Sequence, residues 1–159
     1  MTTRLTLACT GMLVSAGMLA ACSDAGSPTA PAIEPFLWTG SPAYCAFLPS
    51  DTKFSPSDKS TWEFVFVTSP QPGVPLAESP AIMQIGGQQV QLKRAPDAPG
   101  ANGRTWIYRG DGNAFEVELK LEEGAREIGG STGGPQNGTL RLRAPEKGLV
   151  QEVRGGCGL

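Results

Sequence analysis

Apolar and polar residues alternate along much of the chain, most regularly between residues 114 and 122. In this stretch (AFEVELKLE) every second side chain from Phe115 onward is apolar. A period of two, rather than 3.6, predicts a β-strand with one face toward a core. Residues 104–109 (RTWIYR) precede it, and the intervening Gly110–Asn113 (GDGN) predicts a tight turn, so the two stretches are expected to form a β-hairpin.

Other stretches with strand-like patterns surround this hairpin. Residues 81–85 and 88–94 flank Gly86-Gly87, which predicts a second hairpin because its turn requires positive φ angles. Residues 62–68 (WEFVFVT) predict a strand that is buried on both faces. Shorter strands are predicted at 127–130, 139–143 and 149–154, with loops at 68–80, 95–102 and 129–138.

These elements predict an all-β domain that spans residues 36–159. The chain contains 21 glycines and 14 prolines, which favours many turns between short elements, and no helical pattern is evident in this range. About seven or eight short antiparallel strands in a meander would form a small barrel or a two-sheet sandwich, since both architectures deal with exposed strand edges.

Residues 1–21 have the pattern of a secretory signal. Arg4 gives the segment a positive start, and Leu5–Ala21 is uncharged and apolar or small at nearly every position. This run is shorter than the about 20 residues that a membrane span needs, and it ends in small residues. Both features favour a cleaved signal over a retained membrane helix.

Residues Leu19-Ala20-Ala21-Cys22 resemble the lipobox of bacterial lipoproteins, in which an aliphatic and two small residues precede a cysteine. The resemblance implies cleavage after Ala21 and a lipidated Cys22 that anchors the chain in an envelope membrane through its acyl chains. An aspartate after that cysteine retains such proteins at the inner membrane. Ser23 therefore implies an outer-membrane location facing the periplasm if the cell is Gram-negative. Residues 22–35 would comprise the lipidated cysteine and a flexible tether rich in Pro, Ala and Ser.

The fates of the other cysteines follow from this assignment. Cys9 leaves with the signal and Cys22 carries lipid, so Cys45 and Cys157 remain near the two ends of the domain in an oxidising compartment. We expect them to form a disulfide bond. Two free buried thiols are the alternative, and a metal site is disfavoured because the chain has neither histidine nor a CxxC spacing.

The composition disfavours several kinds of chemistry. The absence of histidine removes the most common general base and metal ligand, and a net charge of −2 is too weak to attract nucleic acid. We therefore expect no cofactor, no metal and no nucleic-acid partner. Glu116 and Glu118 share a strand face and could act as an acid–base pair. As the polar face of a strand, they are instead expected to pair with arginines on neighbouring strands: Arg109, Arg141 or Arg143.

Three other features are candidate binding sites. Trp106 and Tyr108 share one strand face and could contact a partner protein or a sugar, although such aromatic residues also fill cores. Asp111–Asn113 lacks the spaced acids of a calcium loop, and the pairs Gly129-Gly130 and Gly133-Gly134 lack the lysine and helix of a phosphate loop, so all predict turns. Trp38 is expected either to pack against the domain or to be exposed.

The layout of the mature chain also resembles the C-type lysozyme inhibitors of the periplasm and outer membrane. The shared features are Cys157 near the end and a strand–glycine–strand middle at Ile85–Gly87. The family's Tyr-x-Cys near the start is represented by Tyr44-Cys45, which lacks the intervening residue. Asn102-Gly103 before Tyr108 corresponds to the family's inhibitory Ser-Gly pair, without its serine. The resemblance implies a small β-barrel and inhibition of lysozyme.

Taken together, the pattern and motifs predict a lipid-anchored envelope protein with a non-catalytic β-domain. That domain is expected to bind an envelope protein or glycan, or to serve the envelope structurally. A lysozyme inhibitor is the first alternative. The second is an enzyme that uses Glu116 and Glu118 on an envelope glycan.

Overall fold

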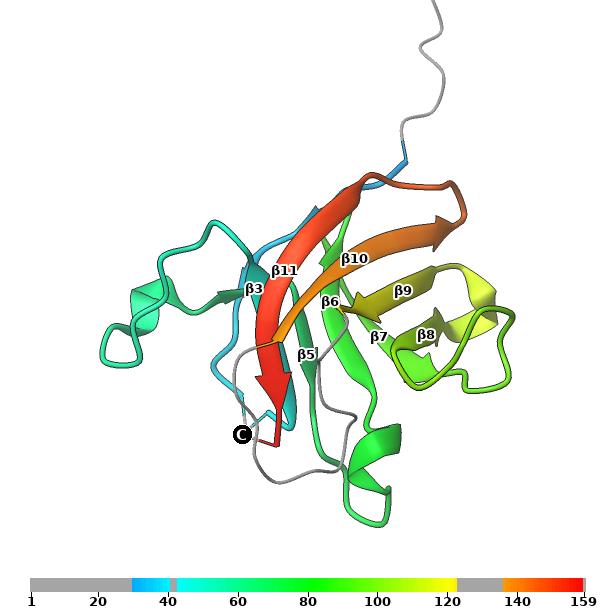
Figure 1. Cartoon of the computed structure of the whole chain (residues 1–159), viewed down its shortest axis with the longest axis horizontal. Coiled ribbons are helices and arrows are strands. Elements are labelled where there is room, and N and C mark those ends of the chain that lie inside the picture. Colours follow the sequence, from blue (N-terminus) through cyan, green and yellow to red (C-terminus); the bar gives the residue numbers. More distant parts are fainter. Residues whose placement is uncertain (1–29, 41–42, 123–135, 159) are drawn as a thin grey trace, which may run out of the picture.

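The computed structural model describes residues 30–40, 43–122 and 136–158, which form a closed antiparallel β-barrel (Figure 1). Each barrel strand pairs with the next along the chain, and the last pairs with the first. The eight barrel strands are β3 (Cys45–Pro49), β5 (Phe66–Thr68), β6 (Ala81–Ile85), β7 (Gln88–Arg94), β8 (Thr105–Gly110), β9 (Glu116–Leu121), β10 (Gln136–Ala144) and β11 (Val150–Cys157). The all-β meander is confirmed, and the pairing of β11 with β3 makes it a barrel.

Shorter elements flank the barrel. Among the described residues the helical segments are three short 3-10 turns: η1 (Lys59–Thr61), η2 (Leu76–Glu78) and η3 (Asp111–Asn113). No helix in this part of the chain is long and apolar enough to cross a membrane. Three short strands complete the structure: β1 (Ile33–Glu34) pairs with β6, and β2 (Phe36–Leu37) pairs with β4 (Glu63–Phe64) in a separate two-stranded sheet.

Both predicted hairpins are present. β6 and β7 have the predicted bounds, and Gly86 and Gly87 between them have φ angles of 56° and 75°. Between β8 and β9, Gly112 and Asn113 have φ angles of 65° and 58°. This left-handed backbone costs little for glycine and is tolerated by asparagine, which is why these sequences form tight turns.

The main core lies inside the barrel, where alternate side chains of each strand meet. On β9, the buried Val117, Leu119 and Leu121 point inward, and the polar residues between them face outward, as the period of two predicted. Phe66 packs edge-on against both Phe47 and Tyr108, with ring centroids 6.0 and 5.1 Å apart. Removing this apolar surface from water is the main stabilising term for the fold.

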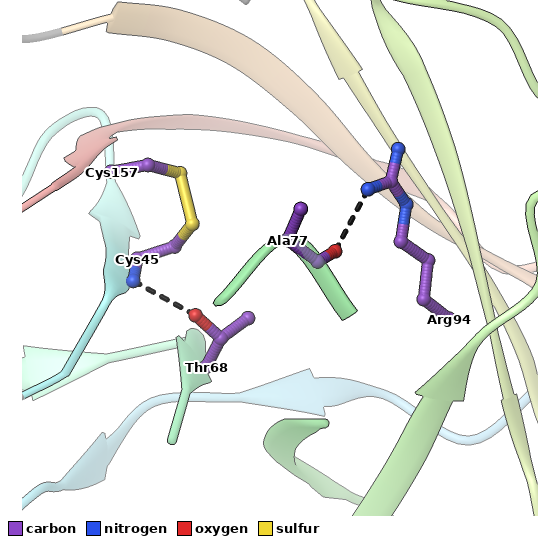
Figure 2. The surroundings of a disulfide bond; sticks show 5 residues. All are labelled: Cys45, Thr68, Ala77, Arg94 and Cys157. Carbon is purple, nitrogen blue, oxygen red and sulfur yellow. Dashed lines mark hydrogen bonds between the residues drawn. A yellow bond between two sulfur atoms is a disulfide. The ribbon is translucent and has the colours of Figure 1, made fainter. Parts of the chain in front are cut away.

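The predicted disulfide between Cys45 and Cys157 is confirmed, and it joins the strands that close the barrel. The two residues are direct partners in the antiparallel β3–β11 pair and are 112 positions apart in sequence. Figure 2 shows the bridge beside Thr68, whose Oγ1 accepts a 2.8 Å hydrogen bond from the Cys45 backbone N–H. The disulfide therefore links the first and last barrel strands covalently at a position where they pair.

Several predicted element boundaries are corrected by the structure. The strand expected at 62–68 is divided at Val65 into β4 and β5, and the tether expected to reach Pro35 ends earlier, because β1 pairs with β6. β10 starts at Gln136, inside the range 129–138 that was expected to be a loop, and the last strand runs to Cys157 rather than Arg154. In addition, β3 was not among the predicted strands, although it pairs with both β11 and β5 in the barrel.

Several sequence predictions fall outside the described residues. These are the signal at 1–21, the lipidated Cys22, most of the tether, the strand at 127–130 and the glycine pairs at 129–130 and 133–134. They stay predictions.

Candidate functional site

Trp106 and Tyr108, the candidate partner-binding residues, lie in the barrel core. Their exposed fractions are 2% and 1%, so the interpretation of this pair as a surface for a partner is wrong. Closure of the barrel turns their strand face inward. Burial raises the pKa of Tyr108 to about 12, and the positive charge of Arg94 opposes part of that rise.

Arg94 lies at the end of the barrel near the disulfide and holds a loop in place. Its guanidinium carbon is 5.6 Å from the centroid of the Trp106 ring. Its Nη1 donates a 2.8 Å hydrogen bond to the carbonyl oxygen of Ala77 in η2 (Figure 2). The arginine therefore satisfies a turn carbonyl and stacks on a core aromatic ring, which gives it a structural role.

The carboxylates of Glu116 and Glu118 lie on the outer face of the barrel within a network of arginines, as predicted. Arg109 Nε is 2.7 Å from Glu116 Oε2, and Arg143 Nε is 3.2 Å from Glu116 Oε1. Arg141 Nη2 is 3.1 Å from Glu118 Oε1. Each carboxylate is held by cross-strand partners, an arrangement that stabilises neighbouring strands rather than one that leaves an acid–base pair free for a substrate.

The remaining sequence candidates in the described part of the chain also have structural roles. Asp111–Asn113 forms the turn η3, and the described residues contain no group of three or more His, Cys, Asp and Glu side chains that could hold a metal. Asn102 Oδ1 accepts 2.8 Å hydrogen bonds from the backbone N–H groups of Arg104 and Thr105 and so stabilises the start of β8. Of the residues that carry the resemblance to lysozyme inhibitors, Asn102-Gly103 thus lies in a loop held by these hydrogen bonds, and Tyr108 is buried in the barrel.

A second, smaller core lies on the outer face of the barrel wall. Cys45 and Phe47 of β3 point into the barrel, whereas Ala46 and Leu48 point outward. The outward residues are covered by β2, β4 and the segment 50–62, which projects beside β3 in Figure 1. A barrel wall with both faces buried creates an additional apolar site outside the barrel interior.

This covering layer carries a hollow of about 580 Å³ with aromatic walls, called the outer groove below. Phe54 packs against Trp62 and Phe64 with ring centroids 6.3 Å away in each case. Phe54 is 40% exposed and Trp62 half-buried, so these rings are available at the groove surface. The residues that line the outer groove are Leu37, Trp38, Thr39, Gly40, Ala43, Ala46, Phe54, Lys59, Ser60, Trp62 and Phe64.

Local hydrogen bonds hold one wall of the outer groove in place. Asp58 accepts hydrogen bonds from the backbone N–H and the hydroxyl of Ser60, which together lower the pKa of Asp58 and begin η1. The indole N–H of Trp62 donates a 3.1 Å hydrogen bond to the Ser55 carbonyl. The ring of Trp62 is therefore oriented by its polar edge, and its apolar surface remains for packing and contact.

Trp38 forms another part of the outer groove wall, and the backbone at Gly40 passes close to its ring. A Cβ atom on Gly40 would overlap the Trp38 indole, so any other residue at position 40 would require the ring to move. The Trp38 ring also lies edge-on to Phe36, with centroids 6.5 Å apart. Trp38 thus packs against the domain, which was one of its two expected positions.

In the part of the chain that the structure describes, the groove lining is mostly apolar and has a single charged group. Lys59 is the one charged residue among the lining residues, and its Nζ lies 5.9 Å from the centroid of the Trp62 ring. Thr39 and Ser60 contribute hydroxyl groups. A hollow of this size and composition is typical of small-molecule sites, which span roughly 300–1,000 Å³ and combine apolar walls with a few polar groups.

Comparisons of the chain with protein-family models, curated proteins and solved structures found no match. The outer groove therefore has to be interpreted from its own chemistry.

Sequence reasoning missed the outer groove because its walls come from short elements with no periodic pattern. Trp38, Phe54 and Trp62 all lie outside the alternating strands, and their proximity depends on the pairing of β2 with β4. The available signal was the concentration of aromatic residues between 36 and 64.

Proposed function

We propose that this chain is a lipid-anchored envelope protein whose β-domain binds, without catalysis, a small amphiphilic anion in the outer groove. The observation that carries the proposal is the aromatic hollow in which Lys59 is the one charged residue among those residues of its lining that the structure describes. An apolar body would pack against the rings of Trp38, Phe54 and Trp62. An acidic head group would lie near the Lys59 ammonium, and none of the described residues that line the hollow carries a carboxylate to repel it.

The anchored location rests on the N-terminal sequence. The uncharged run before Cys22 and the small residues at its end support export, and Leu19-Ala20-Ala21-Cys22 supports lipidation of Cys22. An outer-membrane position facing the periplasm rests on Ser23 in the same way. Such an anchor would keep the binding domain close to the lipids and acyl compounds of the envelope.

The absence of catalysis is supported by composition and by the ion pairs. The chain has no histidine, and the carboxylates of Glu116 and Glu118 are each engaged by arginine within 3.2 Å. The described lining residues bring one ammonium and two hydroxyl groups to the surface of the outer groove. This set of groups is suited to holding an anion rather than to moving a proton at neutral pH.

The proposal is tested by calorimetric titration of residues 23–159, which include every strand of the closed barrel, with dodecanoate below its micelle concentration. The wild-type domain is expected to bind saturably. Trp38→Ala and Phe54→Ala should each weaken binding by about tenfold or more, as the loss of a central aromatic contact does. Lys59→Gln should weaken dodecanoate binding by up to about fivefold, which corresponds to the interaction free energy of an exposed ion pair. Binding of the uncharged dodecanol should not change.

Leu76→Ala is the matched control, because Leu76 is an exposed leucine, 51% accessible, that does not line the outer groove. It should bind as the wild type does. Circular dichroism would establish that each variant is folded. Saturable binding that is unaffected by the Trp38 and Phe54 substitutions would place the ligand elsewhere, and the absence of binding would contradict the proposed ligand class.

Lysozyme inhibition is the second candidate, favoured by the small barrel with a disulfide that joins its first and last strands. The buried Tyr108 is unsuited to contact a lysozyme directly. A titration of C-type lysozyme activity with residues 23–159 tests this candidate, and an undiminished rate at excess domain would end it.

A further inference from the structure

One end of the barrel exposes apolar side chains that the fold does not need at its surface. Leu149 and Val150, where the β10–β11 connection meets β11, have exposed fractions of 94% and 55%. Lys147 beside them is exposed, and Glu146, the acid of this connection, is half-buried. This connection thus exposes two adjacent aliphatic side chains with a lysine next to them. Such a combination is typical of segments that contact a membrane interface.

The N-terminal chain enters the barrel at this same end. Residues 30–33 and 147–151 line one hollow of about 540 Å³, together with Leu142. The backbone N–H of Gly86, in the β6–β7 turn, donates a 2.9 Å hydrogen bond to the carbonyl of Ala32, which fixes the arriving chain there. Figure 1 shows β1 and the β10–β11 connection together at the end opposite the C-terminus.

The length of the connecting chain limits how far this end can lie from a lipidated Cys22. Only residues 23–29 separate Cys22 from Ala30, and a chain extends at most about 3.6 Å per residue. The entry end would therefore lie within about 30 Å of the lipid anchor even if the connection were fully extended. This step rests on the proposed lipidation of Cys22.

We propose that the end of the barrel formed by the chain entry and the β10–β11 connection docks on the bilayer that holds the lipid anchor. Leu149 and Val150 insert into the boundary between head groups and acyl chains, and the Lys147 ammonium lies among the phosphates. The hollow between residues 30–33 and 147–151 faces the lipid. The segment 50–62, which contributes to the outer groove, projects from the side of the barrel (Figure 1), so docking at this end would leave the outer groove accessible.

The test uses the lipidated mature protein in vesicles that contain phospholipids brominated near the glycerol end of the acyl chains. Bromine quenches an indole only on close approach, and Leu149→Trp places an indole at the proposed contact. We expect this added indole to lose roughly half of its emission, after subtraction of the wild-type signal from Trp38, Trp62 and Trp106. Leu149 is almost fully exposed, so the substitution should not disturb folding.

Leu76→Trp is the matched control, because Leu76 is also an exposed leucine but lies in η2 at the opposite end of the barrel (Figure 1). Its indole should keep its emission. If the protein floats with the vesicles but the two indoles are quenched equally or not at all, docking is overturned and the lipid anchor is still supported. A mature N-terminus without lipid, detected by mass spectrometry together with failure to float, would overturn both proposals.

Discussion

Single residues decide how closely the strands of this barrel approach one another. A Cβ atom on Gly155 would overlap the carbonyl of Ala46 and lie 2.7 Å from Phe47 Cα, so β3 and β11 can meet there only because residue 155 is glycine. Gly138 has a similar role between β10 and β9, where a Cβ would lie 2.5 Å from the Lys120 carbonyl. These glycines are needed for space between strands, whereas Gly86 and Gly87 are needed for their φ angles.

Tyr108 makes the barrel sensitive to alkaline pH. Its folded-state pKa of about 12 exceeds the value of 10.0 expected for an unfolded chain, because its hydroxyl would ionise inside the core. The unfolded state therefore releases the proton first, and the stabilising contribution is full below about pH 10 and is lost as pH rises toward 12. We expect a loss of about 2–3 kcal/mol across this window from this residue.

The measurement is urea unfolding of wild type and Tyr108→Phe between pH 9 and 12, with the free energy of unfolding extrapolated linearly to zero urea. Subtracting one curve from the other removes the contributions of groups that the two proteins share. The wild type should lose more stability than the variant across the window. Parallel curves would mean that the Tyr108 hydroxyl ionises without difficulty in the folded protein.

At the scale of elements, the hairpins were predictable and the closing strand was not. Gly86-Gly87 and Gly110–Asn113 identify their turns locally, and the flanking alternation identifies the strands. By contrast, Cys45–Pro49 (CAFLP) has no polar positions, because its two faces contact two different cores. A short apolar run of this kind cannot be distinguished from other buried segments by period alone.

The disulfide acts at this scale, because it joins β3 to β11. Closing a loop of 112 residues restricts the unfolded chain, which contributes about 4–5 kcal/mol in the chain-entropy model. We expect the double variant Cys45→Ala/Cys157→Ala to unfold at a lower urea concentration, with a free energy of unfolding reduced by that amount or somewhat less. Reduced wild type provides the control, since it keeps both sulfur atoms in the buried site. Equal stability of oxidised protein and both comparison forms would contradict this role.

For the full-length protein, we expect the N-terminal segment to attach the barrel to a membrane through lipid on Cys22. If Cys22 is lipidated, the full-length wild type should partition into the detergent phase of a Triton X-114 extract. Cys22→Ser should abolish both the lipid mass and cleavage after Ala21, because the thiol is the acceptor. Cys9→Ser is the matched control and should behave as wild type. Identical lipid-free masses for all three proteins would refute the anchor.

The local order of apolar and polar residues determined the strands with one wet face, the glycine turns and the pairing of Glu116 and Glu118 with arginines across strands. It did so because period, turn conformation and cross-strand charge are short-range properties. The tertiary structure decided which strand face was inside, so it moved Trp106 and Tyr108 from candidate surface to core.

Tertiary pairing also decided that the sheet closes through β3 and β11, and that Trp38, Phe54 and Trp62 line one hollow. Each of these features depends on contacts between segments far apart in sequence or lacking a regular pattern. The cysteines belong to both levels: the sequence selected Cys45 and Cys157 as a pair, and the antiparallel register of two distant strands brought them together.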